Sequence, residues 1–149
     1  MPISPRATLA HVAVVGATIA VTLVRPAWAD APDAGAEHLV ATMECDRAAE
    51  PGRVRCSVEA RADGGAIVWG DVQIVDVPSF ITPLKGRIGV SDATTREPSA
   101  WRWALALVAR QTGQGRVHAR VRLLHCADAD KARCVPVVRE VTAQLSVGR

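Results

Sequence analysis

The chain has 149 residues, 49% of them hydrophobic and 22% charged, which is an ordinary globular balance and excludes wholesale disorder and collagen-like structure. With one Phe, no Tyr and four Trp, the aromatic content is too low for a base-stacking platform of the kind that binds single-stranded nucleic acid. The formal charge falls from +3 to +1 once Arg6 and Arg25, two of the 18 basic residues, are assigned to a leader, which leaves 16 basic against 15 acidic side chains. We therefore predict no nucleic-acid partner, because so small a net charge does not steer a polyanion.

Residues 1–29 have the pattern of a secretory signal peptide. Arg6 supplies the positive start, residues 12–24 form a thirteen-residue uncharged stretch, and residues 27–29 read AWA, an A-x-A cleavage site. The alternative is a membrane anchor, but the stretch is shorter than the roughly 18 to 20 apolar residues that a bilayer requires. We predict a cleaved chain that does not span a membrane and works in the periplasm or outside the cell, where disulfides persist.

Beyond a polar tail at residues 30–36, hydrophobic and polar side chains mostly alternate with a period of two, as in half-buried strands. One segment departs from this rule: the long mixed apolar run at 66–77 predicts a strand that is buried on both faces. Prolines and glycines make residues 78–92 a loop with at most one short strand at 87–90, and residues 93–99 have room for a helical turn. The strands expected from these patterns cover residues 37–45, 53–61, 66–77, 101–110, 117–123 and 137–147.

Short strands separated by turn signals, with no convincing amphipathic helix, predict an all-β fold. We expect an immunoglobulin-like antiparallel β-sandwich of about six to eight strands, forming a single domain over residues 37–149. Trp101 and Trp103, two residues apart, are interpreted as a core stripe rather than a ligand platform.

The four cysteines fall into two pairs with different expected surroundings. Cys45 and Cys56 share the alternation of the inward-facing residues of adjacent strands, so we expect a buried structural disulfide between them. Cys126 and Cys134 fall on the outward-facing alternation, at the two ends of a short charged turn, so both sulfurs are expected to be reachable. That access would permit thiol–disulfide exchange, while a second structural clamp is the alternative.

The last third of the chain resembles a known family. A strand, Cys126, a short turn containing Ala and Asp, Cys134, Pro136 and a final alternating strand match the end of the N-terminal periplasmic domain of the DsbD family of thiol–disulfide interchange proteins. The resemblance covers about 45 to 50 residues. The turn is two residues longer than is usual in the family, and Val135 stands where the family tends to have an aromatic residue.

The resemblance implies an immunoglobulin-like fold and a redox role without a bound cofactor. It gives Cys134 the role of attacking a partner's disulfide, makes Cys126 the resolving thiol, and suggests Phe80 as a cap over the pair. The partners it implies are a membrane redox protein and thioredoxin-like proteins. We expect a monomer.

Other constellations are weaker. His118, His125 and the later cysteines lack the spacing of a zinc site, and no hydrolase or nucleotide-binding motif is present, so we predict neither a metal nor a cofactor. The outward row of His118, Arg120 and Arg122 is interpreted as a solvated strand face with Glu140 as a cross-strand partner, and a docking surface is the alternative.

Two functions therefore remain open from the sequence. The first is a periplasmic or secreted thiol–disulfide exchange module that passes electrons through Cys126 and Cys134, a thiol–disulfide oxidoreductase component. The second is a non-catalytic envelope or secreted β-sandwich that binds a protein partner and is held by two structural disulfides.

Overall fold

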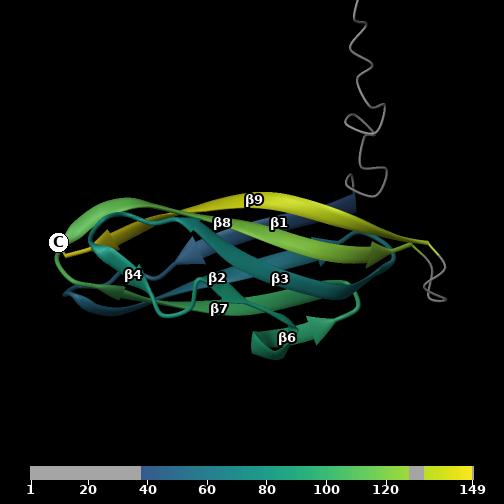
Figure 1. Ribbon diagram of the computed structural model, residues 1–149, viewed down its shortest axis with the longest axis horizontal. Coiled ribbons are helices and arrows are strands. Elements are labelled where there is room, and N and C mark those ends of the chain that lie inside the picture. Colours follow the sequence, from purple (N-terminus) through teal and green to yellow (C-terminus); the bar gives the residue numbers. More distant parts are fainter. Residues whose placement is uncertain (1–37, 128–132, 149) are drawn as a thin grey trace, which may run out of the picture. The chain divides into compact units, whose positions relative to one another are not determined.

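The computed structural model describes residues 38–127 and 133–148. The expected signal peptide at 1–29 and tail at 30–36 lie outside these residues. Within them the chain forms nine strands and one 3-10 turn, η2, which confirms the predicted all-β sandwich (Figure 1). The elements are β1 (Leu39–Cys45), β2 (Gly52–Ala62), β3 (Ala66–Asp76), β4 (Ile81–Pro83), β5 (Arg87–Ile88), η2 (Val90–Asp92), β6 (Ala93–Glu97), β7 (Ala100–Ala109), β8 (Gly113–Cys126) and β9 (Cys134–Val147).

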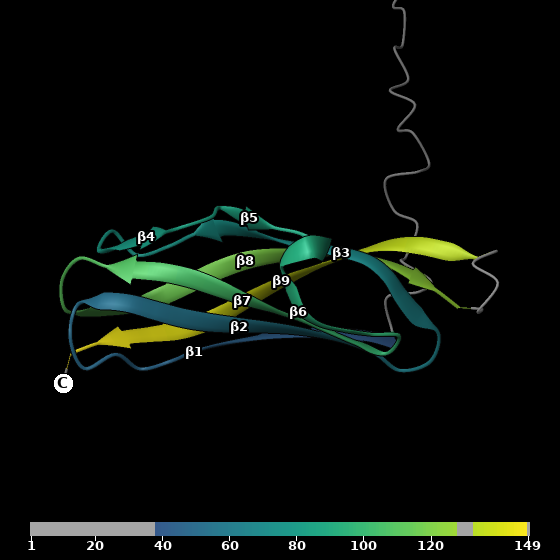
Figure 2. The same cartoon turned by 90° about the horizontal axis from the view of Figure 1, so that it is seen from below.

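The strands form two antiparallel sheets, and in the view of Figure 2 strands β7 and β2 of one sheet overlap β8 and β9 of the other. Sheet A has the order β1-β2-β7-β4, and β6 also pairs with β7, while sheet B has the order β5-β3-β8-β9. Along one edge the sheets meet: Arg139 of β9 donates from Nε to the carbonyl oxygen of Leu39 at 3.0 Å, and Ala48 pairs in parallel with Val147. The described part of the chain contains no helix long and apolar enough to cross a membrane.

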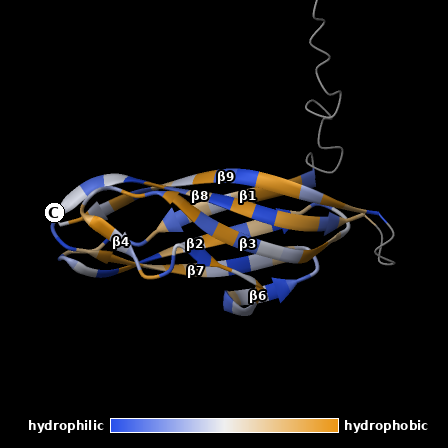
Figure 3. Ribbon diagram, viewed as in Figure 1, coloured by the Kyte–Doolittle hydropathy of each residue, from blue (hydrophilic) through white to orange (hydrophobic). Residues whose placement is uncertain are grey.

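Alternating hydrophobicity decides which side of each strand faces the core (Figure 3). In β7, Trp101, Trp103 and the leucines that follow are buried while the residues between them are exposed or half-buried. The ring centroids of Trp101 and Trp103 lie 5.7 Å apart. Trp103 is fully buried, and its Nε1 donates to the carbonyl oxygen of Gly89 at 3.1 Å. The interpretation of this pair as a core stripe is confirmed.

A glycine allows the two sheets to approach at Trp103. A Cβ atom on Gly70 of β3 would lie 2.8 Å from Cδ2 of Leu123 and 3.0 Å from Cζ2 of Trp103, closer than packed carbon atoms tolerate. Only the absence of a side chain at this position leaves room for the indole of the facing sheet.

Three sequence predictions need correction. Residues 78–92 hold two short strands, β4 and β5, where the sequence predicted at most one at 87–90, and β6 occupies residues 93–97, where the sequence left room for a helical turn. Strand β3 is not buried on both faces, because Trp69 is 40% exposed and Val75 is 51% exposed. A register shift between Ile67 and Trp69 changes the alternation of β3 at that point.

Candidate functional site

Both cysteine pairs are disulfide-bonded, and both join directly opposed residues of a hairpin. Cys45 at the end of β1 faces Cys56 of β2, and Cys126 at the end of β8 faces Cys134 at the start of β9. The bonded residues are 11 and 8 positions apart in sequence. Each bridge therefore closes a short antiparallel hairpin in the same way.

The two bridges lie on different sides of their sheets. Cys56 pairs on its other side with the buried Leu105 and belongs to the contiguous hydrophobic core, as the sequence predicted. Cys126 shares the outward alternation of Arg120 and Arg122 and pairs with half-buried Ala66, outside the main core cluster. The predicted faces of the two bridges are thus observed.

The side of the sheet on which a cysteine lies does not determine how exposed its side chain is. Cys126 has no exposed surface, as is also true of Cys56, while Cys134 and Cys45 are both half-buried. The expectation that both sulfurs of the later pair are reachable is wrong for Cys126. The β2–β3 turn packs against this strand end, because a Cβ on Gly65 would clash with the main-chain oxygen of Cys126 and would lie only 2.6 Å from Nε2 of His125.

Phe80 lies far from the pair that it was expected to cap. It is buried, with its ring against Gly113 and Gly115 at the start of β8, whereas Cys126 is the last residue of the same strand. Eleven residues separate Gly115 from Cys126, so at the rise of a strand the ring is on the order of 35 Å away. Phe80 closes the opposite end of the sandwich and cannot shield the disulfide.

The outer face of sheet B is organised in rows across β3, β8 and β9. The row next to the disulfide consists of Trp69, Leu124 and Pro136, and Val138 lies in the following row on the same side. Trp69, Pro136 and Val138 are exposed, and Leu124 is half-buried. We call these four residues the apolar patch.

The next rows carry charge and centre on a buried carboxylate. Asp71 is 1% exposed, and both of its oxygens are bonded by arginines. Arg122 donates from Nε to Oδ1 at 2.8 Å and from Nη2 to Oδ2 at 2.5 Å, and Arg87 of β5 bonds Oδ2. Burial alone would raise the pKa of Asp71, but the hydrogen bonds and positive charges of Arg122 and Arg87 outweigh it and hold that pKa below its usual range.

The predicted cross-strand pair is also present on this face. Arg120 Nε donates to Oε1 of Glu140 at 2.6 Å, which confirms the sequence interpretation. We call Arg87, Arg120 and Arg122 the cationic flank. The ring of His118 lies beside Thr142, with Nδ1 at 3.1 Å from its hydroxyl oxygen.

The two histidines of β8 do not converge on the cysteines. His118 has the outward alternation, whereas His125 has the inward one, is buried, and has Nε2 at 2.9 Å from the carbonyl oxygen of Gly64. Within residues 38–127 and 133–148, no group of three or more His, Cys, Asp or Glu side chains is placed to hold a metal ion.

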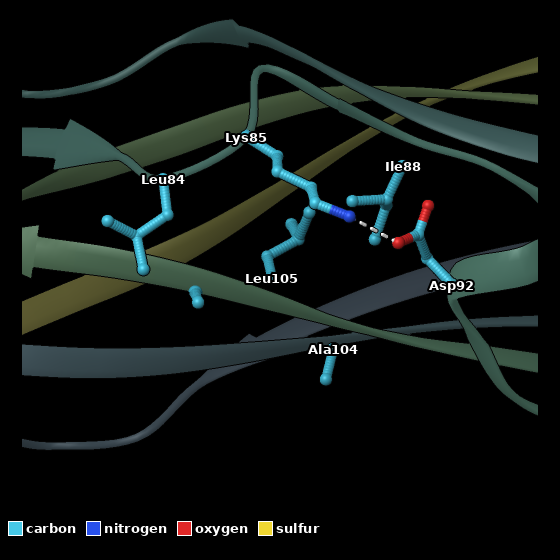
Figure 4. Close-up of a pocket in the computed structure, with 7 residues that line it drawn as sticks. Leu84, Lys85, Ile88, Asp92, Ala104 and Leu105 are labelled. Carbon is cyan, nitrogen blue, oxygen red and sulfur yellow. Dashed lines mark hydrogen bonds and ion pairs between the residues drawn. The ribbon is translucent and has the colours of Figure 1, made fainter.

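A small cavity of about 230 Å³ lies along β7, between the residues that pair with β4 and those that pair with β6 (Figure 4). Lys85 and Asp92 form an ion pair across it, with Nζ and Oδ1 2.6 Å apart. The remaining lining is aliphatic and offers no nucleophile or general base, so the cavity has no evident chemistry. It is lined by Leu84, Lys85, Ile88, Asp92, Ala104, Leu105 and Ala106.

Comparison with known proteins assigns no family. No protein-family model matches the chain, and no curated protein matches it. Among solved structures, an ASH/PapD-like domain of human CEP192 is 7% identical, with 89% of this chain and 99% of that chain covered and a TM-score of 0.41. Self-complemented MyfA, the major subunit of Myf fimbriae from Yersinia enterocolitica, is 10% identical, with 74% and 99% covered and a TM-score of 0.40. BslA, a bacterial hydrophobin, is 8% identical, with 72% and 93% covered and a TM-score of 0.33. At these values none of them lends this chain a family or a function.

The sequence predicted the cysteines and the basic row but missed Asp71 and the apolar patch. Asp71 stands in a largely apolar run, and its partners Arg87 and Arg122 are 16 and 51 residues away. The available signal was Asp71 itself, an acidic residue in the middle of a strand expected to be buried, because a buried carboxylate requires a cationic partner.

Proposed function

We propose that this chain is a non-catalytic, extracytoplasmic β-sandwich module that binds a protein partner and is held together by two structural disulfides. The observation that carries the proposal is the burial of Cys126, which has no exposed surface and whose bridge matches that of Cys45 and Cys56 in register and burial. A bridge built for exchange must let an attacking thiolate approach a sulfur in line. Two hairpin disulfides in one small domain also favour an oxidising compartment.

A redox titration tests this proposal. The protein is equilibrated in glutathione buffers of decreasing potential, free thiols are trapped, and each cysteine is identified by mass spectrometry. We expect both pairs to remain oxidised down to about −300 mV, as is typical of structural bridges. Selective reduction of Cys126 and Cys134 under milder conditions, with Cys45 and Cys56 intact, would overturn the proposal.

Thiol–disulfide exchange through the later pair is the second candidate function. One observation favours it: Cys134, to which the DsbD resemblance gives the attacking role, is half-buried, and the neighbouring row is apolar and exposed. A thioredoxin-like partner could rest on such a surface while its thiolate reaches Cys134. The same titration separates the two candidates, because an exchange module needs the later pair to cycle at a potential available in its compartment.

A further inference from the structure

The outer face of sheet B carries an exposed apolar surface and a positively charged surface side by side. The apolar patch occupies the half of the face beside the Cys126–Cys134 bridge, and the cationic flank occupies the half beyond it. Neighbouring strands lie about 4.8 Å apart and successive rows on one face about 7 Å apart, so the two surfaces adjoin. An exposed apolar group rimmed by charge is the usual composition of a protein-binding site.

The exposed charge on this face is mainly positive. The cationic flank has three guanidinium groups, and the carboxylates that pair with it are Asp71 and Glu140. Because Asp71 is sealed beneath Arg87 and Arg122, the described residues of these rows offer a partner three guanidinium groups against the one exposed carboxylate of Glu140. Farther along the strands, exposed Arg116 and Asp76 add one charge of each sign.

Asp71 also prepares two of these arginines for a second carboxylate. Its contacts in the described part of the chain use Nε and Nη2 of both Arg87 and Arg122, which leaves the N–H donors of each Nη1 for a ligand. An arginine that is already held in place loses less conformational freedom when it binds, so the fixed pair favours association. Guanidinium groups also bind carboxylates with two parallel hydrogen bonds where geometry permits.

We infer that the partner of this module is a polypeptide segment that places apolar side chains on the apolar patch and carboxylates on Arg87, Arg120 and Arg122. This inference rests on the proposed function and specifies the partner's chemistry. A second copy of the chain fits less well, because two such faces would bring arginines against arginines. Trp69 is the expected anchor, since exposed tryptophans carry a large share of binding energy at interfaces.

The test uses a phage-displayed library of short random peptides, selected on the immobilised disulfide-bonded protein. We expect the enriched peptides to combine aliphatic or aromatic residues with Asp or Glu. Synthetic copies should bind the wild type and should bind Trp69→Glu with about tenfold or more lower affinity, as expected for loss of an anchor residue. The matched control is Val40→Glu, which places the same charge at a 61% exposed valine on the outward side of β1 in sheet A.

A charge pair provides the second arm. Arg120→Glu should lower the affinity for acidic peptides about fivefold or more. Arg102→Glu is the control, because Arg102 forms the corresponding ion pair with Glu59 on sheet A, and it should leave the affinity unchanged. Raised salt should weaken binding to the wild type. All four variants are first compared with the wild type by circular dichroism and thermal unfolding, so that loss of binding is not confused with loss of fold.

Several results would overturn the inference. These are the absence of any enriched peptide, enrichment of basic peptides, or equal affinity for Trp69→Glu and Val40→Glu. Trp69-dependent sedimentation with vesicles of phosphatidylcholine and phosphatidylglycerol, without peptide binding, would assign the face to a membrane instead. If binding to another face is found while both disulfides resist reduction, this inference fails and the proposed function stands. Selective reduction of the Cys126–Cys134 bridge would instead overturn the proposed function on which this inference rests.

Discussion

Sheet A and sheet B share two structural features, which differ in their burial and in their neighbouring residues. Each has a disulfide that closes a hairpin, and each has a carboxylate bound by two arginines on its outward side. In sheet A, Glu59 is bound by Arg61 and Arg102 and its side chain is 19% exposed, whereas Asp71 of sheet B is 1% exposed. Burial alone would raise the pKa of Glu59, but Arg102 and Arg61 outweigh it and lower that pKa, just as Arg122 and Arg87 lower the pKa of Asp71.

The neighbours of the two clusters differ. Beside Glu59 lies a polar hollow of about 400 Å³ whose only apolar lining residue is Ala100. Beside Asp71 lies the apolar patch, in which Leu124 of β8 lies between Trp69 of β3 and Pro136 of β9. The same ion cluster is therefore a solvated feature on one sheet and the border of an apolar surface on the other. The two carboxylate–arginine clusters alone do not identify a docking surface. The feature that distinguishes sheet B is the apolar row of residues beside its cluster.

The largest expected effect concerns the bridges. Replacing both cysteines of either pair by alanine should lower the free energy of unfolding by about 2 to 4 kcal/mol, because the closed loops are similar in length. Urea unfolding of the two double variants measures this. A loss below about 1 kcal/mol for the Cys126 and Cys134 variant alone would break the equivalence and favour a role other than clamping.

The next effect tests where the two sheets meet. Gly70→Ala should destabilise the protein by about 1 to 3 kcal/mol, since the new methyl group would collide with Leu123 and Trp103 in a packed core. Gly86→Ala is the control, because a Cβ at that glycine meets nothing within 4 Å. Equal stability of the two variants in thermal unfolding would show that the sheets can separate at Trp103 without cost.

Acid should distinguish the two carboxylates. Because the pKa of Asp71 is lowered in the folded state, its stabilisation is complete above the unfolded value near pH 4 and is lost as pH falls through the folded pKa. At pH 7 we expect Asp71→Asn to cost about 1 to 3 kcal/mol, and this difference from wild type should shrink toward pH 2.

Glu59→Gln provides the comparison on sheet A. The sign is the same, because the pKa of Glu59 is also lowered, but its arginines are more than half exposed, so the cost at pH 7 should be below about 1 kcal/mol. Denaturant titrations at several pH values give both curves. Identical curves for the two variants would mean that burial of Asp71 adds nothing to its ion pairs.

The smallest effect concerns the exposed cross-strand pairs. Arg120→Ala and Arg102→Ala should each change stability by less than about 1 kcal/mol, because both side chains are about half exposed and water screens the pairs. A larger loss of stability for Arg120→Ala, measured in the same urea titration, would indicate that the cationic flank stabilises the fold rather than binding a partner.

The sequence was informative where side chains alternate over a long strand. Trp101 to Leu107 of β7 and the cysteines of both hairpins were assigned to the correct faces from a period of two alone. Strands β4 and β6, of three and five residues, are too short to show a period, so the sequence predicts only loop or turn there. The short strand that the sequence allows at 87–90 corresponds to β5. The exposure of Trp69 depends on a register shift, which no simple alternation predicts.

The sequence could not predict how accessible the Cys126–Cys134 disulfide is, for a different reason. Alternation tells which side of a sheet Cys126 faces, but whether water or another thiol reaches it depends on what packs there. The β2–β3 turn at Gly65, some sixty positions away in sequence, approaches that strand end. The partners of Asp71 and the distance between Phe80 and the disulfide are likewise set by tertiary arrangement.

The most direct test of the central claim is the rate at which dithiothreitol reduces each bridge in the native protein, followed by thiol trapping across low urea concentrations. If both bridges are structural clamps, reduction of Cys126–Cys134 and of Cys45–Cys56 should be comparably slow, and both rates should rise with urea as the sandwich opens. Rapid reduction of Cys126–Cys134 alone, at a rate that does not change with urea, would contradict the account.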